Sequence, residues 1–139
     1  MRRDLTIDDL DDLVKLPLLA VLATHRRDGT VLLSPVWHEW YDGGFQVVTS
    51  SNNVKAVQLA RDPRASIVVC EHIPPYRGVE VRCHVRLATT AVGDAIRRIA
   101  SRYLGAEAGA AYADSAGDNL LIRLEPGHLR GWDFADDFA

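Results

Sequence analysis

The chain has 139 residues, of which 47% are hydrophobic and 25% charged, with 16 Lys and Arg against 19 Asp and Glu. This composition is ordinary for a globular protein, and we expect a single domain over residues 1–139. The net charge of −3 argues against general nucleic-acid binding, which depends on a basic surface. No apolar stretch approaches the roughly 20 residues that a membrane span requires, and the first residues lack the apolar segment of a signal peptide. We therefore expect a cytoplasmic protein that binds neither nucleic acid nor membrane.

The first part of the chain predicts one helix and a series of hairpin strands. Thr6 and Asp9 have the spacing of a capping box, and Pro17 ends the helix that they begin. Asp28-Gly29 is a strong two-residue hairpin signal. Pro35 places its strand at an edge of the sheet or at a bulge. The strands expected here span residues 18–24, 30–40 and 45–50.

The second part of the chain predicts further strands between short helices. Asn52 or Asn53 caps a helix that ends at Pro63. Residues 79–87 alternate between apolar and polar side chains, which indicates a half-buried strand. Pro126-Gly127 is expected to join two strands within residues 119–134. The remaining elements are a strand at 65–72, an amphipathic helix at 92–105 and a short Ala-rich helix after it.

Consecutive hairpins with Pro and Gly at the corners favour a small antiparallel barrel over a parallel sheet. We expect a mainly β (α+β) fold of six to seven antiparallel strands with short flanking helices. The chain contains no Gly-rich dinucleotide motif, no Walker loop and no internal repeat.

Metal binding and nucleophilic catalysis find little support in the sequence. Cys70, His72, Cys83 and His84 lie on two expected strands, but Cys83 and His84 must point to opposite faces. At most three of these four side chains could converge, so buried cysteines and a histidine at the rim are the favoured interpretation. No nucleophile has a partner base at a recognisable spacing. We therefore predict no metal site and name no catalytic residue.

Two local patterns each admit two interpretations. Lys55 lies in the first turn of a short helix, directly after the polar run at residues 49–53. Free backbone N–H groups, hydroxyls and one cation there suit a phosphate, although the same residues would also cap a helix beside a solvated lysine. Trp37 and Trp40 flank His38, either as core residues or as a platform on which a flat heterocycle stacks.

Taken together, these pieces resemble the split β-barrels related to pyridoxamine 5′-phosphate oxidase, which bind flavin or deazaflavin. Four motifs in order carry the resemblance over nearly the whole chain. They are LATHRRDGTVLLSPVWHEW at 22–40, VTSSNNVKAVQLARDPRASIVV at 48–69, PPYRGVEVRCHVRL at 74–87 and RGWDF at 130–134. The PPYR motif resembles that of the branch of this family associated with coenzyme F420.

The resemblance implies a homodimer with two equivalent cofactor sites at the subunit interface and a small-molecule substrate. Lys55 would bind the cofactor phosphate. The other contacts would be Ser34, Val36 and Trp37 beneath the ring, hydrogen bonds from Thr49, Ser50, Ser51 and Asn52, and further contacts from Tyr76, Arg77 and Trp132.

Two departures from the family pattern bear on that site. An arginine is common in the loop before Lys55, but here the loop is Ser51-Asn52-Asn53-Val54. One charge-assisted hydrogen bond is worth roughly 1.5–3 kcal/mol, so its loss weakens phosphate binding unless Arg77, Arg82 or Arg26 replaces it. In addition, Cys83 stands where a small residue, commonly Gly, is expected.

The resemblance implies an F420-dependent reductase that transfers a hydride to a small unsaturated or conjugated substrate. FMN in the same groove is the alternative cofactor, with oxidase or electron-transfer chemistry. A third interpretation is a flavin or haem carrier or sensor, for which His38 or His72 would be the axial ligand of haem. A family member that has lost its cofactor is a fourth. His38, Tyr76 or water are the candidate proton donors.

Overall fold

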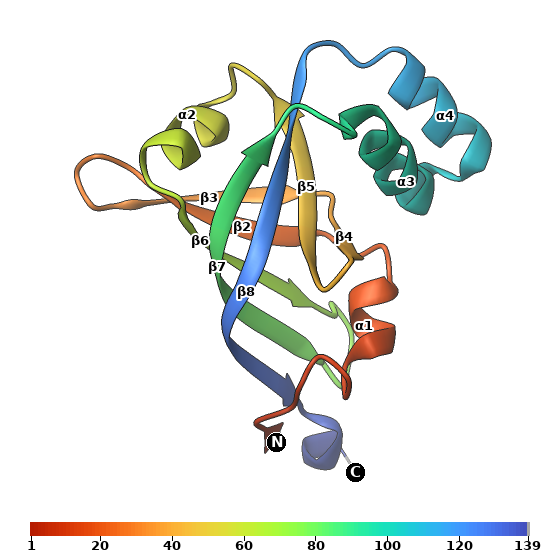
Figure 1. Cartoon of the computed structure of the whole chain (residues 1–139). Coiled ribbons are helices and arrows are strands. Elements are labelled where there is room, and N and C mark those ends of the chain that lie inside the picture. The colour runs from red at the N-terminus through yellow and green to blue at the C-terminus, as the bar shows by residue number, and fades with distance from the viewer. Residues whose placement is uncertain (139) are drawn as a thin grey trace.

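The computed structural model describes residues 1–138, and an antiparallel sheet dominates it (Figure 1). The strands are ordered β3-β2-β6-β7-β8-β5-β4, and β1 pairs with β8. The strands are β1 (Arg2–Arg3), β2 (Ala20–His25), β3 (Val31–Val36), β4 (Glu39–Tyr41), β5 (Gly44–Ser50), β6 (Arg64–Cys70), β7 (Gly78–Ala88) and β8 (Asn119–Asp133). The helices are α1 (Asp11–Lys15), α2 (Val54–Arg61), α3 (Val92–Leu104), α4 (Ala106–Asp114) and the 3₁₀ helix η1 (Ala135–Phe138).

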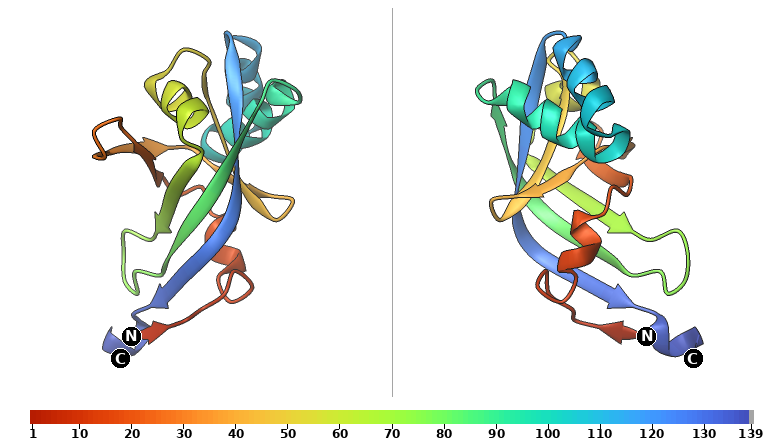
Figure 2. Two further views of the ribbon diagram at one scale, coloured as in Figure 1. Left: turned by 60° about the vertical axis from the view of Figure 1, so that its left-hand side comes forward. Right: turned by 90° about the vertical axis from the view of Figure 1, so that its right-hand side faces the viewer.

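The two ends of this strand order are joined by a very short link. β3 ends at Val36 and β4 begins at Glu39. Three Cα–Cα steps span at most about 11 Å, so the sheet has to curl until its first and last strands come close together (Figure 2). This confirms the expected mainly β fold with an antiparallel sheet and short flanking helices. None of the helices within residues 1–138 is both long and apolar enough to cross a membrane.

The core fills the inside of the curled sheet. The apolar positions of β7 alternate as expected, and Val79, Val81, Cys83 and Val85 are buried while the polar residues between them reach the surface. They pack in one cluster with Phe45 of β5 and with the buried face of α1. The helix α1 contributes Leu10, Leu13 and Val14 from its start and first turns.

A single strand over residues 30–40 is wrong, because the chain changes its partner at Trp37-His38. β3 pairs with β2, whereas β4 pairs with β5. Side chains of α3 hold the link between them. The backbone N–H of His38 donates to the Tyr103 hydroxyl at 3.0 Å, and the carbonyl of His38 accepts from the guanidinium of Arg102. Pro35 does lie in an edge strand, as its missing N–H predicts.

Two strands joined at Pro126-Gly127 are also wrong, because β8 continues through this pair. Val81 faces Leu129 and Cys83 faces Pro126, so Gly127 and His128 together oppose the one residue between them on β7. This is a β-bulge. A Cβ on Gly127 would lie 2.9 Å from a backbone oxygen of β7, so only glycine fits there.

The helix α2 is capped at its N-terminus and is fixed on β2 by hydrogen bonds from its middle and its last residue. Asn53, rather than Asn52, is the N-cap, and its side-chain oxygen accepts the backbone N–H of Lys55 at 3.0 Å. The hydroxyl of Thr24 donates to the side-chain oxygen of Gln58 at 2.6 Å, and both groups are buried. Arg61 donates to a backbone carbonyl at the end of β2 at 2.6 Å. These contacts determine where the first turn of α2, and with it Lys55, lies.

We expect Thr24→Val to lower the free energy of unfolding by about 1–3 kcal/mol, because it leaves the buried Gln58 side chain without its donor. Urea unfolding followed by circular dichroism measures this change. Thr24→Ser keeps the hydroxyl and is the matched control. Equal urea midpoints for Thr24→Val and wild type would show that the Thr24–Gln58 bond does not hold α2.

Candidate functional site

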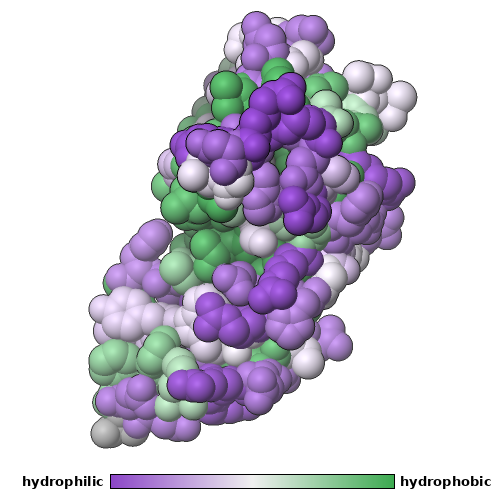
Figure 3. All heavy atoms as spheres, turned by 90° about the vertical axis from the view of Figure 1, so that its left-hand side faces the viewer, coloured by the Kyte–Doolittle hydropathy of each residue, from purple (hydrophilic) through white to green (hydrophobic). Residues whose placement is uncertain are grey.

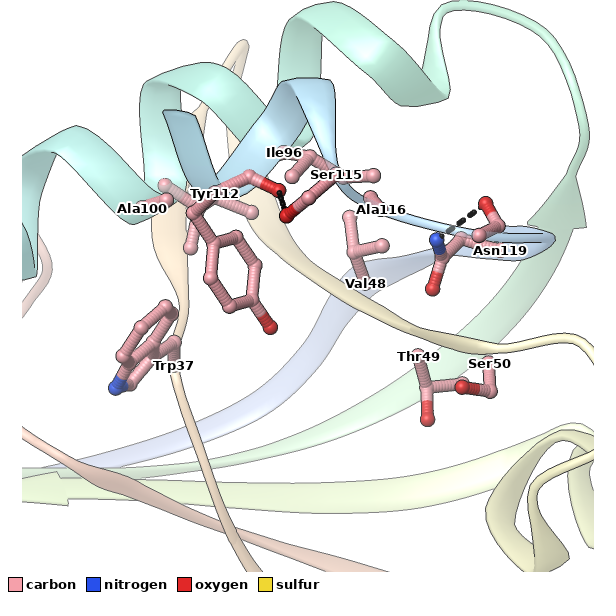
Figure 4. A pocket seen from close by; sticks show the side chains of 12 residues that line it. Trp37, Val48, Thr49, Ser50, Ile96, Ala100, Tyr112, Ser115, Ala116 and Asn119 are labelled. Atoms are coloured by element: carbon pink, nitrogen blue, oxygen red, sulfur yellow. Dashed lines mark hydrogen bonds between the residues drawn. The ribbon is translucent and has the colours of Figure 1, made fainter. Parts of the chain in front are cut away.

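A cavity of about 400 Å³ lies between β5, α3 and α4 (Figure 4). Its size suits a small organic molecule. The side chains around it come from the β3–β4 link, β5, α3, α4 and the segment that leads into β8. The lining residues are Trp37, Val48, Thr49, Ser50, Ile96, Ile99, Ala100, Tyr112, Ser115, Ala116, Gly117 and Asn119.

One end of the cavity is aromatic and apolar. The ring of Trp37 stacks on Tyr103, with centroids 5.0 Å apart and planes 9° from parallel, and it meets Tyr112 at 5.3 Å and 52°. The Tyr103 hydroxyl is itself fixed, because it donates to the carbonyl of Leu18 at 2.8 Å and accepts from the backbone of His38. Trp37 is therefore held in the cavity wall by a ring whose own position is set from two sides.

The other end of the cavity is polar but uncharged. The Ser115 hydroxyl donates to the Tyr112 carbonyl at 3.1 Å, and the Asn119 amide nitrogen donates to the Gly117 carbonyl at 2.8 Å (Figure 4). These bonds fix the segment that runs from α4 to β8. Thr49 and Ser50 complete this end from β5. The cavity can thus offer hydroxyl and amide groups to a ligand.

Lys55 lies just beyond this polar end, in the first turn of α2. Its ammonium nitrogen donates to the Asn53 side chain at 3.1 Å, and within residues 1–138 it makes no ion pair. Burial lowers the pKa of Lys55 from its usual value, because a half-buried cation loses solvation. A half-buried cation whose partner is a neutral amide is suited to an anionic ligand.

The predicted cofactor residues occupy two regions of the chain. Thr49, Ser50, Ser51, Asn52 and Lys55 form one polar run from the end of β5 into α2. On β3, Ser34 is half-buried and Val36 is part of the core. Trp37 lines the cavity, as do Thr49 and Ser50.

The remaining predicted contacts lie at the far end of the long β7–β8 pair. Trp132 pairs with Gly78 there, whereas Thr49 pairs with Leu120 at the opposite end of β8. The loop with Tyr76 precedes Gly78. One chain therefore does not bring Tyr76, Arg77 and Trp132 next to Lys55, and their contact with a cofactor stays a prediction.

Arg77 is occupied by two carboxylates of its own chain. Its guanidinium pairs with Glu71 and with Asp12, the latter at 2.8 Å. The hydrogen bond from Arg77 lowers the pKa of Asp12 below its usual range. Arg26 likewise donates to the Val31 carbonyl at 2.8 Å. Arg82 is the third candidate to replace the arginine that is missing from the loop before Lys55. Its side chain projects from β7 into solvent.

His38 is fully buried behind the cavity wall and does not line the cavity. Burial, assisted by nearby Arg102, lowers its pKa to about 3, so the ring is neutral. Because the Tyr103 proton is donated to Leu18, the ring Nδ1 of His38, 3.1 Å from that hydroxyl, carries the imidazole proton. The Nε2 atom then has no partner within residues 1–138. A neutral, enclosed imidazole is a poor proton donor.

The residues that α3 and α4 contribute to the cavity were not predicted from the sequence. Ile96, Ile99 and Ala100 follow the amphipathic pattern of α3, which predicts burial but not a cavity. Tyr112 is the one aromatic residue of the Ala-rich helix α4, and this was the one sequence feature that could have indicated its role in the cavity.

The metal candidates do not form a cluster. Burial raises the pKa of the Cys83 thiol to about 12, and within the described chain no three His, Cys, Asp or Glu side chains converge.

Comparison with protein families matches residues 7–133 to the model of the pyridoxamine 5′-phosphate oxidase family. The chain belongs to this family. The match covers every strand from β2 to β8, and it includes both the cavity and Lys55. No curated protein matches the chain.

Solved structures of similar fold include proteins of the pyridoxamine 5′-phosphate oxidase type with different ligands. A conserved hypothetical protein from Mycobacterium tuberculosis is 24% identical, with a TM-score of 0.81 over 97% of this chain and 89% of that one. An F420 reductase is 24% identical, with a TM-score of 0.71 over 86% and 94%. The haem storage protein HutZ from Vibrio cholerae is 17% identical, with a TM-score of 0.69 over 88% and 91%. At these identities the likeness shows the fold alone.

We expect His38 to make the folded protein less stable in acid. Its pKa is about 3 when folded and near 6.5 when unfolded, so below pH 6.5 the unfolded chain takes up a proton that the folded chain refuses. The stability present above pH 6.5 is therefore lost as the pH falls toward 3, by up to about 1.4 kcal/mol per pH unit. The control is His38→Gln, which keeps every carboxylate. If urea unfolding of wild type and His38→Gln shows the same slope between these pH values, the folded His38 titrates normally.

Proposed function

We propose that this protein is an F420-dependent oxidoreductase and that Lys55 binds the phosphate of the cofactor. The observation that carries the proposal is the half-buried ammonium of Lys55, which has only the Asn53 side chain as a partner within residues 1–138. A cation that is partly removed from water loses solvation, and a phosphate would restore it. The N-terminal end of α2 adds the positive end of a helix dipole.

The residues around Lys55 fit a phosphate. Thr49, Ser50 and Ser51 supply hydroxyl donors along the turn from β5 to α2. The Asn53 cap holds the backbone N–H of Lys55, which fixes the first turn of the helix. Family membership and the fold shared with an F420 reductase support the choice of cofactor.

Reduced deazaflavin supplies a hydride for a conjugated or otherwise unsaturated acceptor. The residues of this chain bind and orient the reactants. The family resemblance assigns Ser34, Val36 and Trp37 to the cofactor ring, and stacking on Tyr103 limits rotation of the Trp37 plane. Because His38 is neutral and enclosed, the proton that completes the reduction comes from water or from another side chain.

FMN is the second candidate, because its phosphate would use the same lysine. The two cofactors are told apart by chemistry and colour, since FMN makes the purified protein yellow and allows reaction with oxygen. Haem finds less support in the site, even though a haem storage protein shares the fold. His38 is enclosed in the core away from the cavity, and His72 is exposed on the loop after β6.

We also propose that the chain works as a homodimer. Leu33 on β3 is 65% exposed, and Val54 and Val57 on α2 are 58% and 59% exposed. The β2–β3 hairpin and α2 project toward the viewer in Figure 3, where apolar side chains gather around a hollowed part of the surface. An exposed apolar face of this kind is typical of an interface. A second chain would also bring its own Tyr76, Arg77 and Trp132 within reach of Lys55.

We expect Lys55→Ala to weaken binding of F420 by about tenfold or more, because a charge-assisted hydrogen bond worth roughly 1.5–3 kcal/mol is lost. Fluorescence titration of the purified protein with F420, and separately with FMN, measures the two dissociation constants. Lys55→Arg keeps the charge and should restore part of the affinity.

The matched control is Lys15→Ala, because Lys15 is the other lysine of the chain and forms an exposed pair with Asp11. It should bind the cofactor as wild type does. Equal affinity of wild type and Lys55→Ala would remove Lys55 from the phosphate site. If neither F420 nor FMN binds wild type, the fold stands but the proposed oxidoreductase function does not.

We expect the double variant Leu33→Lys, Val57→Lys to be a monomer at concentrations where wild type is a dimer, because burying two unpaired cations at an interface is costly. Sedimentation velocity gives the mass of each. Leu104→Lys places the same charge on an exposed leucine at the end of α3 and should leave the dimer intact. A wild-type monomer, or a dimer that survives the double substitution, would refute this interface.

A further inference from the structure

The cavity beneath α4 has no charged wall. None of its twelve lining residues within the described chain carries a charge. The arginines of α3 are used elsewhere. Arg98 donates to both carboxylate oxygens of Glu39 at 3.0 and 3.1 Å, and Arg102 donates to the Leu16 carbonyl at 2.7 Å. An anion inside the cavity would therefore lose its solvation without gaining a partner cation.

We propose that this cavity binds an uncharged, flat, ring-containing molecule with a carbonyl or hydroxyl group at one end. The inference that this molecule is the hydride acceptor rests on the proposed function. The cofactors considered above are anions, so the same absence of charge places their phosphate outside the cavity, at Lys55.

The shape of the apolar end suits a ring. Figure 4 shows the Tyr112 side chain reaching down from α4 beside Trp37, with Val48 on the opposite side. Tyr112 stays 50% exposed although it lines the cavity. Aromatic rings that meet at an angle and are partly exposed gain contact area when another ring packs against them.

The polar end suits a carbonyl or hydroxyl group. The Asn119 nitrogen is engaged with Gly117 at 2.8 Å, which presents the amide at this end, and Thr49 and Ser50 bring hydroxyls from β5. Thr49 and Ser50 also begin the polar run that leads to Lys55, so a ligand in the cavity would adjoin the cofactor. A C=C bond conjugated with that carbonyl would gain a hydride from the reduced cofactor at one carbon and a proton from water at the other, which leaves the cofactor oxidised by two electrons.

Naphthol and naphthoate test the charge selection, since they share a ring system and differ in charge at neutral pH. Isothermal titration of the cofactor-free full chain should show naphthol binding, with naphthoate at least about tenfold weaker because its carboxylate finds no cation. Ala116→Phe fills the cavity and should lower naphthol affinity at least about tenfold. Ala111→Phe adds the same ring at an exposed position of α4 and should bind as wild type.

Tyr112→Ala is a second variant that removes one wall without filling the core, and it should also weaken naphthol binding. The proposal would be overturned if neither Ala116→Phe nor Tyr112→Ala changed the affinity for naphthol. It would also be overturned if naphthoate bound as tightly as naphthol. Displacement of naphthol by saturating F420 would overturn it as well, because it would give the cavity to the cofactor. If Lys55→Ala still binds naphthol, the cavity is a site separate from the phosphate site at Lys55. If wild type binds naphthol but neither cofactor, both the acceptor role and the proposed function are refuted.

Discussion

The hydrogen bonds from α3 to the backbone of His38 are the contacts on which the rest of the structure depends. Tyr103 accepts the His38 N–H, and Arg102 donates to its carbonyl. They hold the link at which the chain leaves one edge of the sheet and enters the other. The same helix turns Ile96 and Ala100 toward the cavity. The curl of the sheet and the shape of the cavity therefore have a common support.

Local patterns in the sequence predict the elements that local forces determine. The hairpin at Asp28-Gly29, the alternation in β7 and a cap at Asn53 needed only neighbouring residues. The break at Trp37-His38 could not be predicted, because the groups that hold it lie more than sixty residues later in α3. The continuity of β8 through Pro126 depends on a bulge against β7, and no local pattern distinguishes this from a turn.

The candidate site also has a part that could be predicted from neighbouring residues and a part that depends on contacts between distant segments. The polar run that ends at Lys55 is contiguous in sequence, so the prediction that it binds an anion needed only the order of residues. The cavity is built from five separate segments, and Tyr112 and Asn119 join Trp37 there only after α3 and α4 have packed. The ion pairs of Arg77 could not be predicted, because a free arginine and one paired with Glu71 and Asp12 look alike in a sequence.

The length of β7 and β8 has a consequence for how the chain loses its fold. One end of this pair carries β6 and the loop after it, while the other carries β5 and supports α3. Both ends share the same two central strands, β7 and β8. Loss of pairing at one end therefore removes neighbours from the strands that support the other end. We therefore expect the sheet to unfold in one cooperative transition.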